Sequence, residues 1–373
     1  MKRASKALGL FSGGLDSILA IKLVQEQGIE VTALHCVSPF FGKPEKVPHW
    51  REVYGFDIEI VDVSQYFVDM LVRGPEHGFG SVLNPCVDCK IIMMQRASAI
   101  REARGADFII SGEVLGQRPM SQRRDTLNII RRDAGVRDTL LRPLCARHMD
   151  QTEAELSGLV DRERLLGFSG RGRKDQMALA GRMGLSEIPT PGGGCRLAEK
   201  ENARSYWPVL AYTPSPTVCD FTLANTGRQY WHTPDEAAGA ARATGKPGGI
   251  FRLIMGRNQE DNTNIMQLAG ERDLLFKTAD FPGPIALGRF FGKEWPSEAV
   301  LSAAALCASY SGKGVRHAEQ SLAPIAVRVH PGSLDAPVQV VQVRPNREPP
   351  GFNWRELSWE AVRSYLRTGG GAI

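Results

Sequence analysis

The chain has 373 residues, of which 42% are hydrophobic and 23% are charged, and its formal net charge is +5. This length suits two or three domains with full cores, and the ordinary apolar fraction and small net charge exclude intrinsic disorder. The absence of an 18-residue apolar run and of an apolar leader argues against a membrane span and secretion. Seven cysteines, an odd number, favour reduced thiols with a catalytic or metal-binding role, so we expect a cytoplasmic protein without membrane contact.

Strand-like and helix-like segments alternate over the first 110 residues. The expected strands are Ala7–Phe11, Val31–Val37, Phe56–Val61 and Asp107–Ser111, and the expected helices are Ser17–Glu26 and Ile91–Ala103. Strands separated by helices predict an α/β domain built on a parallel sheet. Ligands of such sheets bind at the carboxyl ends of the strands, which here are Ser12, His35-Cys36 and Ser111-Gly112.

A second, smaller module with α+β character is expected after a linker. The Pro-, Thr- and Ser-rich segment at residues 212–217 predicts this linker, with domains at 1–211 and 218–373. The expected strands beyond it are Phe251–Met255, Leu274–Thr278, Ile285–Leu287, Ile325–Val329 and Val338–Val343, with one Ala-rich helix at Ser297–Ser309.

The most specific motif is a glycine-containing loop between the first strand and the first helix. It reads Ser12-Gly13-Gly14-Leu15-Asp16-Ser17. Two glycines allow a tight turn and close approach to a phosphate, and the following helix N-terminus supplies partial positive charge. A kinase-type phosphate loop needs a Gly-Lys-Ser/Thr sequence, and the missing lysine argues against γ-phosphoryl transfer.

This loop resembles the signature of the PP-loop ATP pyrophosphatases, an adenine nucleotide α-hydrolase-like fold. Members attach AMP to a carbonyl oxygen and release pyrophosphate. The resemblance implies that Ser12, Gly13, Gly14, Asp16 and Ser17 bind ATP and that Asp16 helps to hold Mg²⁺.

A later segment indicates which PP-loop enzymes the chain is most similar to. Residues 111–117 read SGEVLGQ and are followed by Ser121-Gln122 and by Arg142-Pro143-Leu144, which together resemble the tRNA 4-thiouridine synthases. Gly112 at a strand end admits an adenine ring, and Gln117 can read a polar edge. We therefore expect His35, Gly112 and Gln117 to contribute to the ATP site.

Three cysteines form the candidate sulfur site. Cys86 and Cys89 make a CxxC just ahead of the expected helix, and Cys195 follows three glycines. The residues alone leave three alternatives: a redox or persulfide pair, a structural zinc site, or three ligands of an iron–sulfur cluster. Several PP-loop tRNA thiolases use a CxxC and a distant cysteine for a 4Fe-4S cluster, and this resemblance favours the cluster, with all three cysteines catalytic beside Asp16.

Excess positive charge is concentrated after the expected adenine loop. Between Arg118 and Lys174 the chain has 13 Lys and Arg against 8 Asp and Glu, so this stretch carries the whole net charge. Salt-bridged helix faces have the same composition, but a cluster beside the expected catalytic edge favours RNA contact. The RNA-contact candidates in this stretch are Arg123, Arg124, Arg171, Arg173 and Lys174.

A segment of the second module resembles the NFACT-type RNA-binding domain over about residues 250–345. The residues that carry this resemblance are Gly256-Arg257-Asn258, Asp280-Phe281-Pro282-Gly283 and Ala308-Ser309-Tyr310-Ser311. The implied RNA contacts are Gly256, Arg257, Asn258 and Lys277.

These features together predict a tRNA sulfurtransferase that adenylates a uridine carbonyl and replaces its oxygen with sulfur, with 4-thiouridine favoured. The expected partners are tRNA and a sulfur donor, either sulfide or the persulfide of a cysteine desulfurase; a homodimer is left open. A wobble 2-thiouridylase is the nearest alternative. An RNA-binding adaptor with a non-catalytic nucleotide domain and an amide-forming PP-loop ligase are alternatives from other classes.

Overall fold

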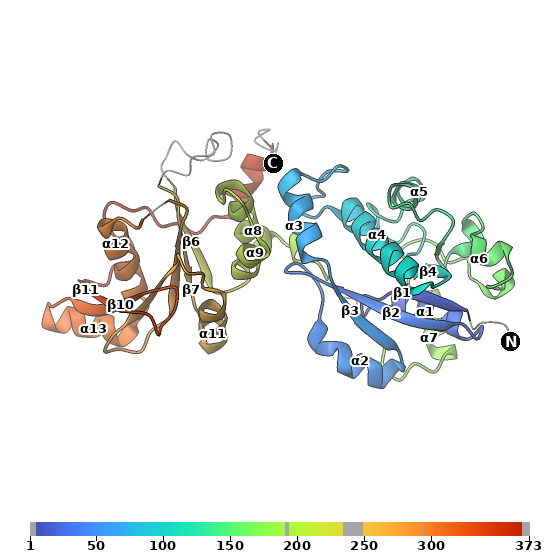
Figure 1. Cartoon of the computed structure of the whole chain (residues 1–373), viewed down its shortest axis with the longest axis horizontal. Coiled ribbons are helices and arrows are strands. Elements are labelled where there is room, and N and C mark those ends of the chain that lie inside the picture. The colour runs from blue at the N-terminus through green and yellow to red at the C-terminus, as the bar shows by residue number, and fades with distance from the viewer. Residues whose placement is uncertain (1–4, 191–193, 234–248, 293, 368–373) are drawn as a thin grey trace. The chain divides into compact units, whose positions relative to one another are not determined.

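The computed structural model describes residues 5–190, 194–233, 249–292 and 294–367. The chain divides into two compact units, residues 1–198 and 199–373 (Figure 1). None of the helices in these described ranges has both the length and the apolar character needed to cross a bilayer.

The first unit is an α/β domain with a five-stranded, fully parallel sheet in the order β3-β2-β1-β4-β5. Its elements are β1 (Lys6–Leu10), α1 (Leu15–Gln25), β2 (Glu30–Val37), α2 (Val47–Tyr54), β3 (Asp57–Asp62), α3 (Ser64–Arg73), α4 (Cys86–Arg104), β4 (Phe108–Ser111), α5 (Arg124–Asp133), β5 (Leu140–Leu141), α6 (Glu153–Leu156) and α7 (Lys174–Arg182). The expected parallel sheet and all four expected strands are confirmed.

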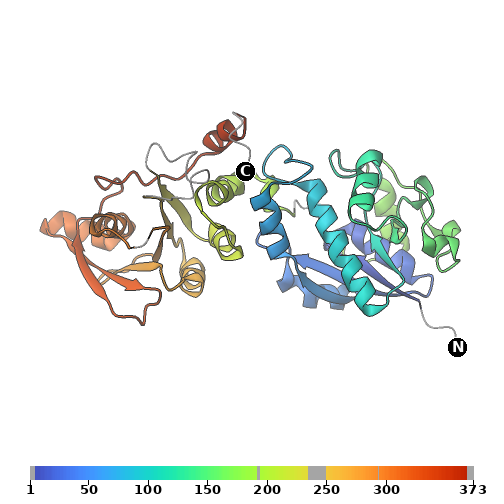
Figure 2. The same cartoon turned by 45° about the horizontal axis from the view of Figure 1, so that its top comes forward.

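Helices cover both faces of this sheet. Buried residues of α1, α2 and α7 form one continuous apolar core with β1 and β2, while α4 packs against β1 and β4 on the other side with α3 and α5 as its neighbours (Figure 2). Strand order reverses between β1 and β4, and ligands of open α/β sheets bind at the carboxyl ends of the strands at such a reversal.

The second unit contains a six-stranded antiparallel sheet in the order β11-β10-β8-β9-β7-β6. Its elements are α8 (Lys200–Tyr212), α9 (Val218–Ala224), β6 (Arg228–His232), β7 (Phe251–Met255), α11 (Gln259–Leu268), β8 (Leu274–Thr278), β9 (Ala286–Phe290), α12 (Ser297–Ala308), α13 (Gly312–Ser321), β10 (Ile325–Pro331), β11 (Gln339–Val343) and α14 (Trp359–Arg367). The expected α+β character and Ala-rich helix are confirmed; β6 was not anticipated.

Two apolar layers sandwich this sheet. The Ala-rich helix α12 packs on one face against Phe276, Val327 and Val341, and α9 and α11 pack on the other face against Ile254 and Leu287. Figure 1 shows α12 and α11 on opposite sides of β7.

The division between the units lies before α8, not at the predicted linker. α8 packs against α9 and α14, and the segment at residues 212–217 is the turn that joins α8 to α9. Thr217 caps α9, because its hydroxyl accepts from the Asp220 N–H (3.3 Å). Pro and Ser in this segment therefore mark a helix–helix turn inside the second unit.

Candidate active site

The loop between β1 and α1 has the shape of an anion-binding turn. Gly13 has a φ of +76°, and a Cβ at this position would collide with the ring of Trp50, so only glycine fits. Gly14 is the N-cap of α1 and no side chain caps this helix. The Ser17 N–H donates to the Gly14 carbonyl (3.1 Å), so the Leu15 and Asp16 N–H groups are the ones that remain for a bound anion.

Ser12 and Ser17 hold this loop in place from within. The Ser17 hydroxyl donates to the Gly14 carbonyl (2.7 Å) and accepts from the Ser12 N–H (3.3 Å), while the Ser12 hydroxyl accepts from the Gly14 N–H (3.3 Å). Both hydroxyls thus preorganise the turn before any ligand arrives.

Asp16 carries the clearest sign of an unmet partner. Gln117 Nε2 donates to Asp16 Oδ2 (3.0 Å), but Asp16 Oδ1 and Gln117 Oε1 are buried without a hydrogen-bond partner among the described residues. Burial raises the pKa of Asp16, and the Gln117 hydrogen bond together with Arg173 and Arg118 opposes this rise. Buried oxygens of this kind are costly unless a ligand or cation meets them.

Gly112 brings the loop after β4 into direct contact with α1. A Cβ on Gly112 would lie 2.6 Å from the backbone carbon and oxygen of Asp16 and 2.6 Å from the Ser17 nitrogen. These are main-chain atoms and cannot move aside. Gly112 and Gln117, both predicted for the ATP site, therefore lie against the β1–α1 loop. Gly112 packs against the Asp16 backbone, and Gln117 donates to the Asp16 carboxylate.

The sequence predicted that His35 contributes to the ATP site, but both of its ring nitrogens are occupied by backbone groups of the protein. It is 2% exposed, its Nε2 accepts from the Lys43 N–H (3.0 Å), and its Nδ1 donates to the Phe11 carbonyl (2.9 Å). Burial lowers the pKa of His35, which favours the neutral tautomer that these two hydrogen bonds require. His35 is a structural support of the phosphate loop.

A buried ion pair anchors the loop after β4. Arg142 Nε donates to Glu113 Oε2 (2.9 Å), and both side chains are 2% exposed. Burial alone would raise the pKa of Glu113, but Arg142 and Lys90 outweigh it and hold the pKa below its usual range. Lys90 Nζ lies 3.8 Å from Glu113 Oε1, and Lys90 directly follows Cys89. An ion pair between Lys90 and Glu113 thus connects α4, which carries Cys86 and Cys89, to the loop after β4.

The structure places the three predicted cysteines in one region. Cys86 is the first residue of α4, so the CxxC occupies the first helical turn, not the segment ahead of it; Asn84 Nδ2 donates to Cys86 Sγ (3.1 Å). Two backbone hydrogen bonds hold the residues that follow Cys195: the Leu83 N–H donates to the Leu197 carbonyl (3.1 Å) and the Arg196 N–H to the Phe40 carbonyl (2.9 Å).

Electrostatics show that the thiols approach one another. Burial raises the pKa of Cys89, the charges of Cys195 and Cys86 raise it further, and Lys90 opposes them. Cys36, at the end of β2, also acts on Cys89, and burial raises the pKa of Cys36 to about 11. Cys36, which belongs to one of the strand ends where the sequence predicted ligand binding, is thus a fourth thiol in this region.

The metal alternatives differ in how closely the sulfur ligands must converge. Across the described ranges, no three Cys, His, Asp or Glu side chains converge closely enough to bind one metal ion. Zinc needs its sulfur ligands about 2.3 Å from one ion, whereas a cubane cluster holds its cysteines on separate iron atoms. The described residues therefore contain no ready-made site of the single-ion kind that structural zinc needs.

The Arg-rich segment is largely paired within the protein. Arg131 pairs with Asp150, Arg162 with Glu155 and Arg142 with Glu113, and these three arginines are buried or half-buried. Arg123 pairs with exposed Asp125 (3.2 Å), and Arg124 donates to the His148 carbonyl (2.7 Å).

Three of the predicted RNA contacts in this segment remain unpaired. Arg171, Arg173 and Lys174 make no ion pair with any residue that the structure describes. The charge of Arg173 lowers the pKa of Asp16, so this guanidinium lies near the β1–α1 loop.

The Gly-Arg-Asn motif of the second unit is occupied by internal contacts. Asn258 caps α11 by accepting from the Asp261 N–H (2.8 Å), and Arg257 Nε donates to Asp261 Oδ2 (2.7 Å). A Cβ on Gly256 would collide with Asn262, whose Oδ1 accepts from the Ile285 N–H (3.0 Å). These residues close the β7–α11 junction, although Arg257 and Asn258 are exposed; Lys277 is also exposed, on β8.

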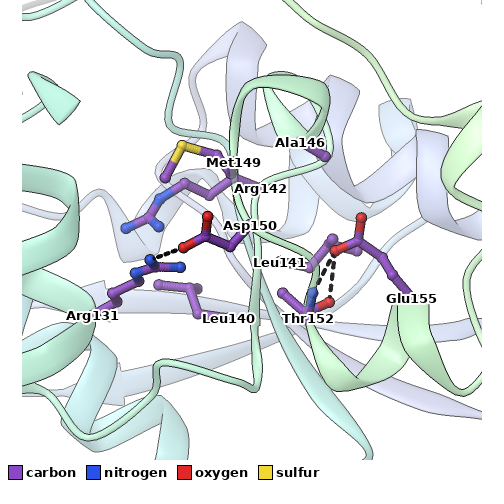
Figure 3. Close-up of a pocket in the computed structure, with 9 residues that line it drawn as sticks. All are labelled: Arg131, Leu140, Leu141, Arg142, Ala146, Met149, Asp150, Thr152 and Glu155. Atoms are coloured by element: carbon purple, nitrogen blue, oxygen red, sulfur yellow. Dashed lines mark hydrogen bonds and ion pairs between the residues drawn. The ribbon is translucent and has the colours of Figure 1, made fainter.

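A small crevice beside α5 is a poor candidate for the site. Figure 3 shows Arg131 paired with Asp150, and Thr152 donating from its N–H and hydroxyl to Glu155 Oε2 (2.8 Å each). Its polar side chains are satisfied by one another or by neighbouring residues, and none of the predicted ATP or cysteine residues lines it.

Sequence reasoning missed two residues of the phosphate site. Gln176 of α7 is 1% exposed, and its side-chain amide lies close enough to Asp16 to lower the pKa of that carboxyl. Trp50 of α2 enforces glycine at position 13. Neither residue lies in a recognisable motif, and only the buried glutamine in an otherwise amphipathic helix could have signalled the site.

Comparison with known families agrees with both resemblances. Residues 3–155 match the model of the family "Thiamine biosynthesis protein (ThiI)", and residues 246–348 match that of the "NFACT protein RNA binding domain".

Individual relatives match only part of the chain. A probable tRNA sulfurtransferase of Thermococcus kodakarensis is 34% identical over 120 residues, which is 30% of this chain and 30% of that protein. The chain spans about a third of the length of the curated relatives it matches.

Two solved structures are also similar to parts of the chain. A 4-thiouridine synthetase–RNA complex with bound ATP is 27% identical, covering 37% of this chain and 36% of that one, with a TM-score of 0.31. The U34-tRNA thiolase NcsA of Methanococcus maripaludis, with its [4Fe-4S] cluster, is 17% identical, covering 52% and 61%, with a TM-score of 0.30.

Proposed function

We propose that this chain is an ATP-dependent tRNA thiouridine synthase, with 4-thiouridine as its product. The observation that carries the proposal is the pair of buried, unpartnered oxygens on Asp16 and Gln117 at the phosphate loop. The match of residues 3–155 to the ThiI family and the tRNA sulfurtransferase names of the relatives support it.

In the first step, the uracil O4 attacks the α-phosphate of ATP and pyrophosphate leaves. The N–H groups at the start of α1 and the charges of Arg173 and Arg118 stabilise the departing pyrophosphate. Asp16 Oδ1 fits a Mg²⁺ ion, because a buried carboxylate oxygen without a partner is the ligand such a cation prefers. When bound, Mg²⁺ neutralises the charge of the phosphates.

In the second step, hydrogen sulfide anion attacks C4 of the adenylated uridine. The C4–O bond breaks, AMP leaves with the oxygen, and one proton is released as the thiocarbonyl forms. Oxygen becomes a good leaving group only through the first step, which is why the reaction consumes ATP. Cys86, Cys89 and Cys195 are the residues that would hold sulfur for this attack.

The same three cysteines fit a 4Fe-4S cluster. Cys86 and Cys195 both act electrostatically on Cys89, and three thiolates would leave one iron of such a cluster without a protein ligand. Such a cluster, when bound, supplies an iron that can carry sulfide. The protein's own contribution is to fix the thiols: the Cys195 segment through the Leu83 and Phe40 backbones, and Cys86 through Asn84. The second unit would bind the tRNA.

An anaerobic assay tests the proposal. The chain is purified without oxygen, and unmodified tRNA, ATP and sulfide are added. We expect tRNA-dependent release of pyrophosphate and AMP, and mass spectrometry of the digested tRNA should locate sulfur at C4 of uridine. ATP binding without tRNA-dependent pyrophosphate release would instead establish an adaptor; sulfur at C2 would establish a 2-thiouridylase.

Cysteine variants separate the two chemical steps. Cys195→Ala should retain tRNA-dependent pyrophosphate release but lose thiolation and the visible iron–sulfur absorbance. Cys219→Ala is the matched control, because this partly buried thiol of the second unit donates only to the Leu268 carbonyl (3.5 Å). Normal thiolation by Cys195→Ala would refute the role of the three cysteines.

A further inference from the structure

One face of the β8–β10–β11 part of the second sheet is exposed at Lys277, Arg328 and Val340, although Leu275 on the same face of β8 is buried with residues of α9 and α11. Phe276, Val327 and Val341 point to the α12 face and are buried in its core. Since side chains alternate along strands, Lys277, Arg328 and Val340 point to the opposite face, and all three are exposed. We call this set, with Gln342, the open face.

The register of the strands places two cations side by side on the open face. Lys277 lies directly opposite Arg328, and Arg328 lies directly opposite Val340. Cβ atoms of directly opposed residues are about 4.5–5.5 Å apart, and like charges at this spacing destabilise a sheet. The fold therefore carries a cost that its own packing does not explain.

No acidic side chain offsets these charges. Neither Lys277 nor Arg328 forms an ion pair with any residue in the described part of the chain. Asp280 and Asp335 stand in the turns next to these strands, and neither reaches the two cations. The contrast with Arg257, Arg252 and Arg289, which all pair with aspartates in the same unit, is clear.

The surroundings of the two cations indicate what kind of ligand fits. Val340 is 52% exposed and Val338 is 48% exposed, so an apolar strip borders the charges. Among the described residues of these three strands, the open face presents no Phe, Tyr or Trp on which a base could stack, unlike sheets that read single-stranded bases. Charge without stacking platforms suits a polyanionic backbone.

We propose that the open face binds the phosphate backbone of RNA through Lys277 and Arg328. This proposal deepens the proposed function and rests on it for the identity of the RNA. It moves the RNA contact of this unit away from the Gly256–Asn258 loop, whose polar groups are occupied internally. Because the contact is to phosphates, the affinity depends on salt and little on base sequence.

Fluorescence anisotropy with labelled, unmodified tRNA and the full chain tests this surface. The variant K277E/R328E should bind about tenfold more weakly, and its plot of log affinity against log salt should be less steep by about 1.4–1.8, at about 0.7–0.9 per lost phosphate contact. Thermal melting should show that the variant remains folded.

The control K313E/R316E introduces the same charge change on α13, where both side chains are exposed. Gly314 of this helix faces Ile325, which belongs to the α12 face, so the control alters a different surface. It should bind tRNA within twofold of the wild type. An equal loss in both variants would show that only net charge matters and would overturn the proposal.

Two further outcomes distinguish failure of the surface from failure of the function. If wild-type chain releases pyrophosphate with tRNA but K277E/R328E keeps the same KM for tRNA, the open face is not the RNA surface. If vesicles of anionic phospholipid compete fully with tRNA and bind through the same two cations, the ligand is not RNA specifically, and the proposal is wrong. A wild type that releases no pyrophosphate refutes the proposed function instead.

Discussion

The two units contain the same kind of junction, a strand followed by a glycine-containing loop and a helix, with opposite results. At the β1–α1 junction, Asp16 and Gln117 keep buried oxygens without partners and α1 has no side-chain cap. At the β7–α11 junction, Asn258 caps the helix, and Arg257 and Asp261 satisfy each other. A glycine at which a Cβ would collide with its neighbours therefore indicates close packing, whereas buried polar atoms without hydrogen-bond partners indicate a ligand site.

Among the substitutions that test this difference between the two junctions, Asp16→Ala should have the largest effect on activity. Asp16→Ala removes the buried carboxylate that orients the phosphate loop and its cation, so tRNA-dependent pyrophosphate release should fall by about 10²–10³-fold. A coupled assay for pyrophosphate measures it. The equivalent change at the other junction, Asn258→Ala, should leave this rate within twofold; a similar loss in both would erase the distinction between the junctions.

Gly112→Ala should have the next largest effect. Its Cβ would lie 2.6 Å from main-chain atoms of Asp16 and Ser17, so the first turn of α1 must shift. We expect ATP affinity to drop by about tenfold or more, since a small displacement of loop N–H groups weakens charge-assisted hydrogen bonds. Isothermal calorimetry with ATP measures it. Gly172→Ala, where the added atom meets nothing within 4 Å, is the control and should bind normally.

Gly256→Ala tests the β7–α11 junction, where we expect the glycine to affect stability and not ATP binding. The added Cβ would collide with the Asn262 amide, which must give up its hydrogen bond with the Ile285 N–H. Overpacking of this kind should lower the free energy of unfolding of the second unit by about 1–3 kcal/mol. Urea denaturation reports this loss, and ATP affinity should not change. Weaker ATP binding in this variant would contradict a purely structural role.

The smallest effect is expected for Arg257→Ala. Arg257 is half-exposed, and its pairing with Asp261 should contribute about 0.2–1 kcal/mol to stability. Its affinity for tRNA should stay within twofold of the wild type in the anisotropy assay. A tenfold loss here, with K277E/R328E unaffected, would return the RNA contact to the β7–α11 junction.

Much of the first unit follows from local sequence. Alternation of apolar runs and helical spacing predicted the parallel sheet, and the Ser12–Ser17 motif located the loop at its carboxyl edge. What local pattern could not reveal is how side chains are shared between distant segments. His35 lies at a strand end as expected, but Lys43 and Phe11 occupy both of its ring nitrogens.

Long-range placement explains the other differences. Gln176 and Trp50 reach the phosphate loop from α7 and α2, and no spacing rule connects these helices to residue 16. The Arg-rich segment looked like a single basic surface, yet three of its arginines, Arg131, Arg142 and Arg162, are buried or half-buried and paired with acidic side chains. Composition reports the charge of a segment but not which charges stay unpaired.

The Glu113–Arg142 pair has an evolutionary consequence. Because both side chains are almost fully buried, losing either one strands a charge in the interior, at a cost of about 3–5 kcal/mol, whereas replacing both with uncharged residues of similar volume can be neutral. Single substitutions at these positions would be purged while paired replacements survive. Positions 113 and 142 are 29 residues apart in the chain. We therefore expect substitutions at these two positions to occur together among descendants of this sequence.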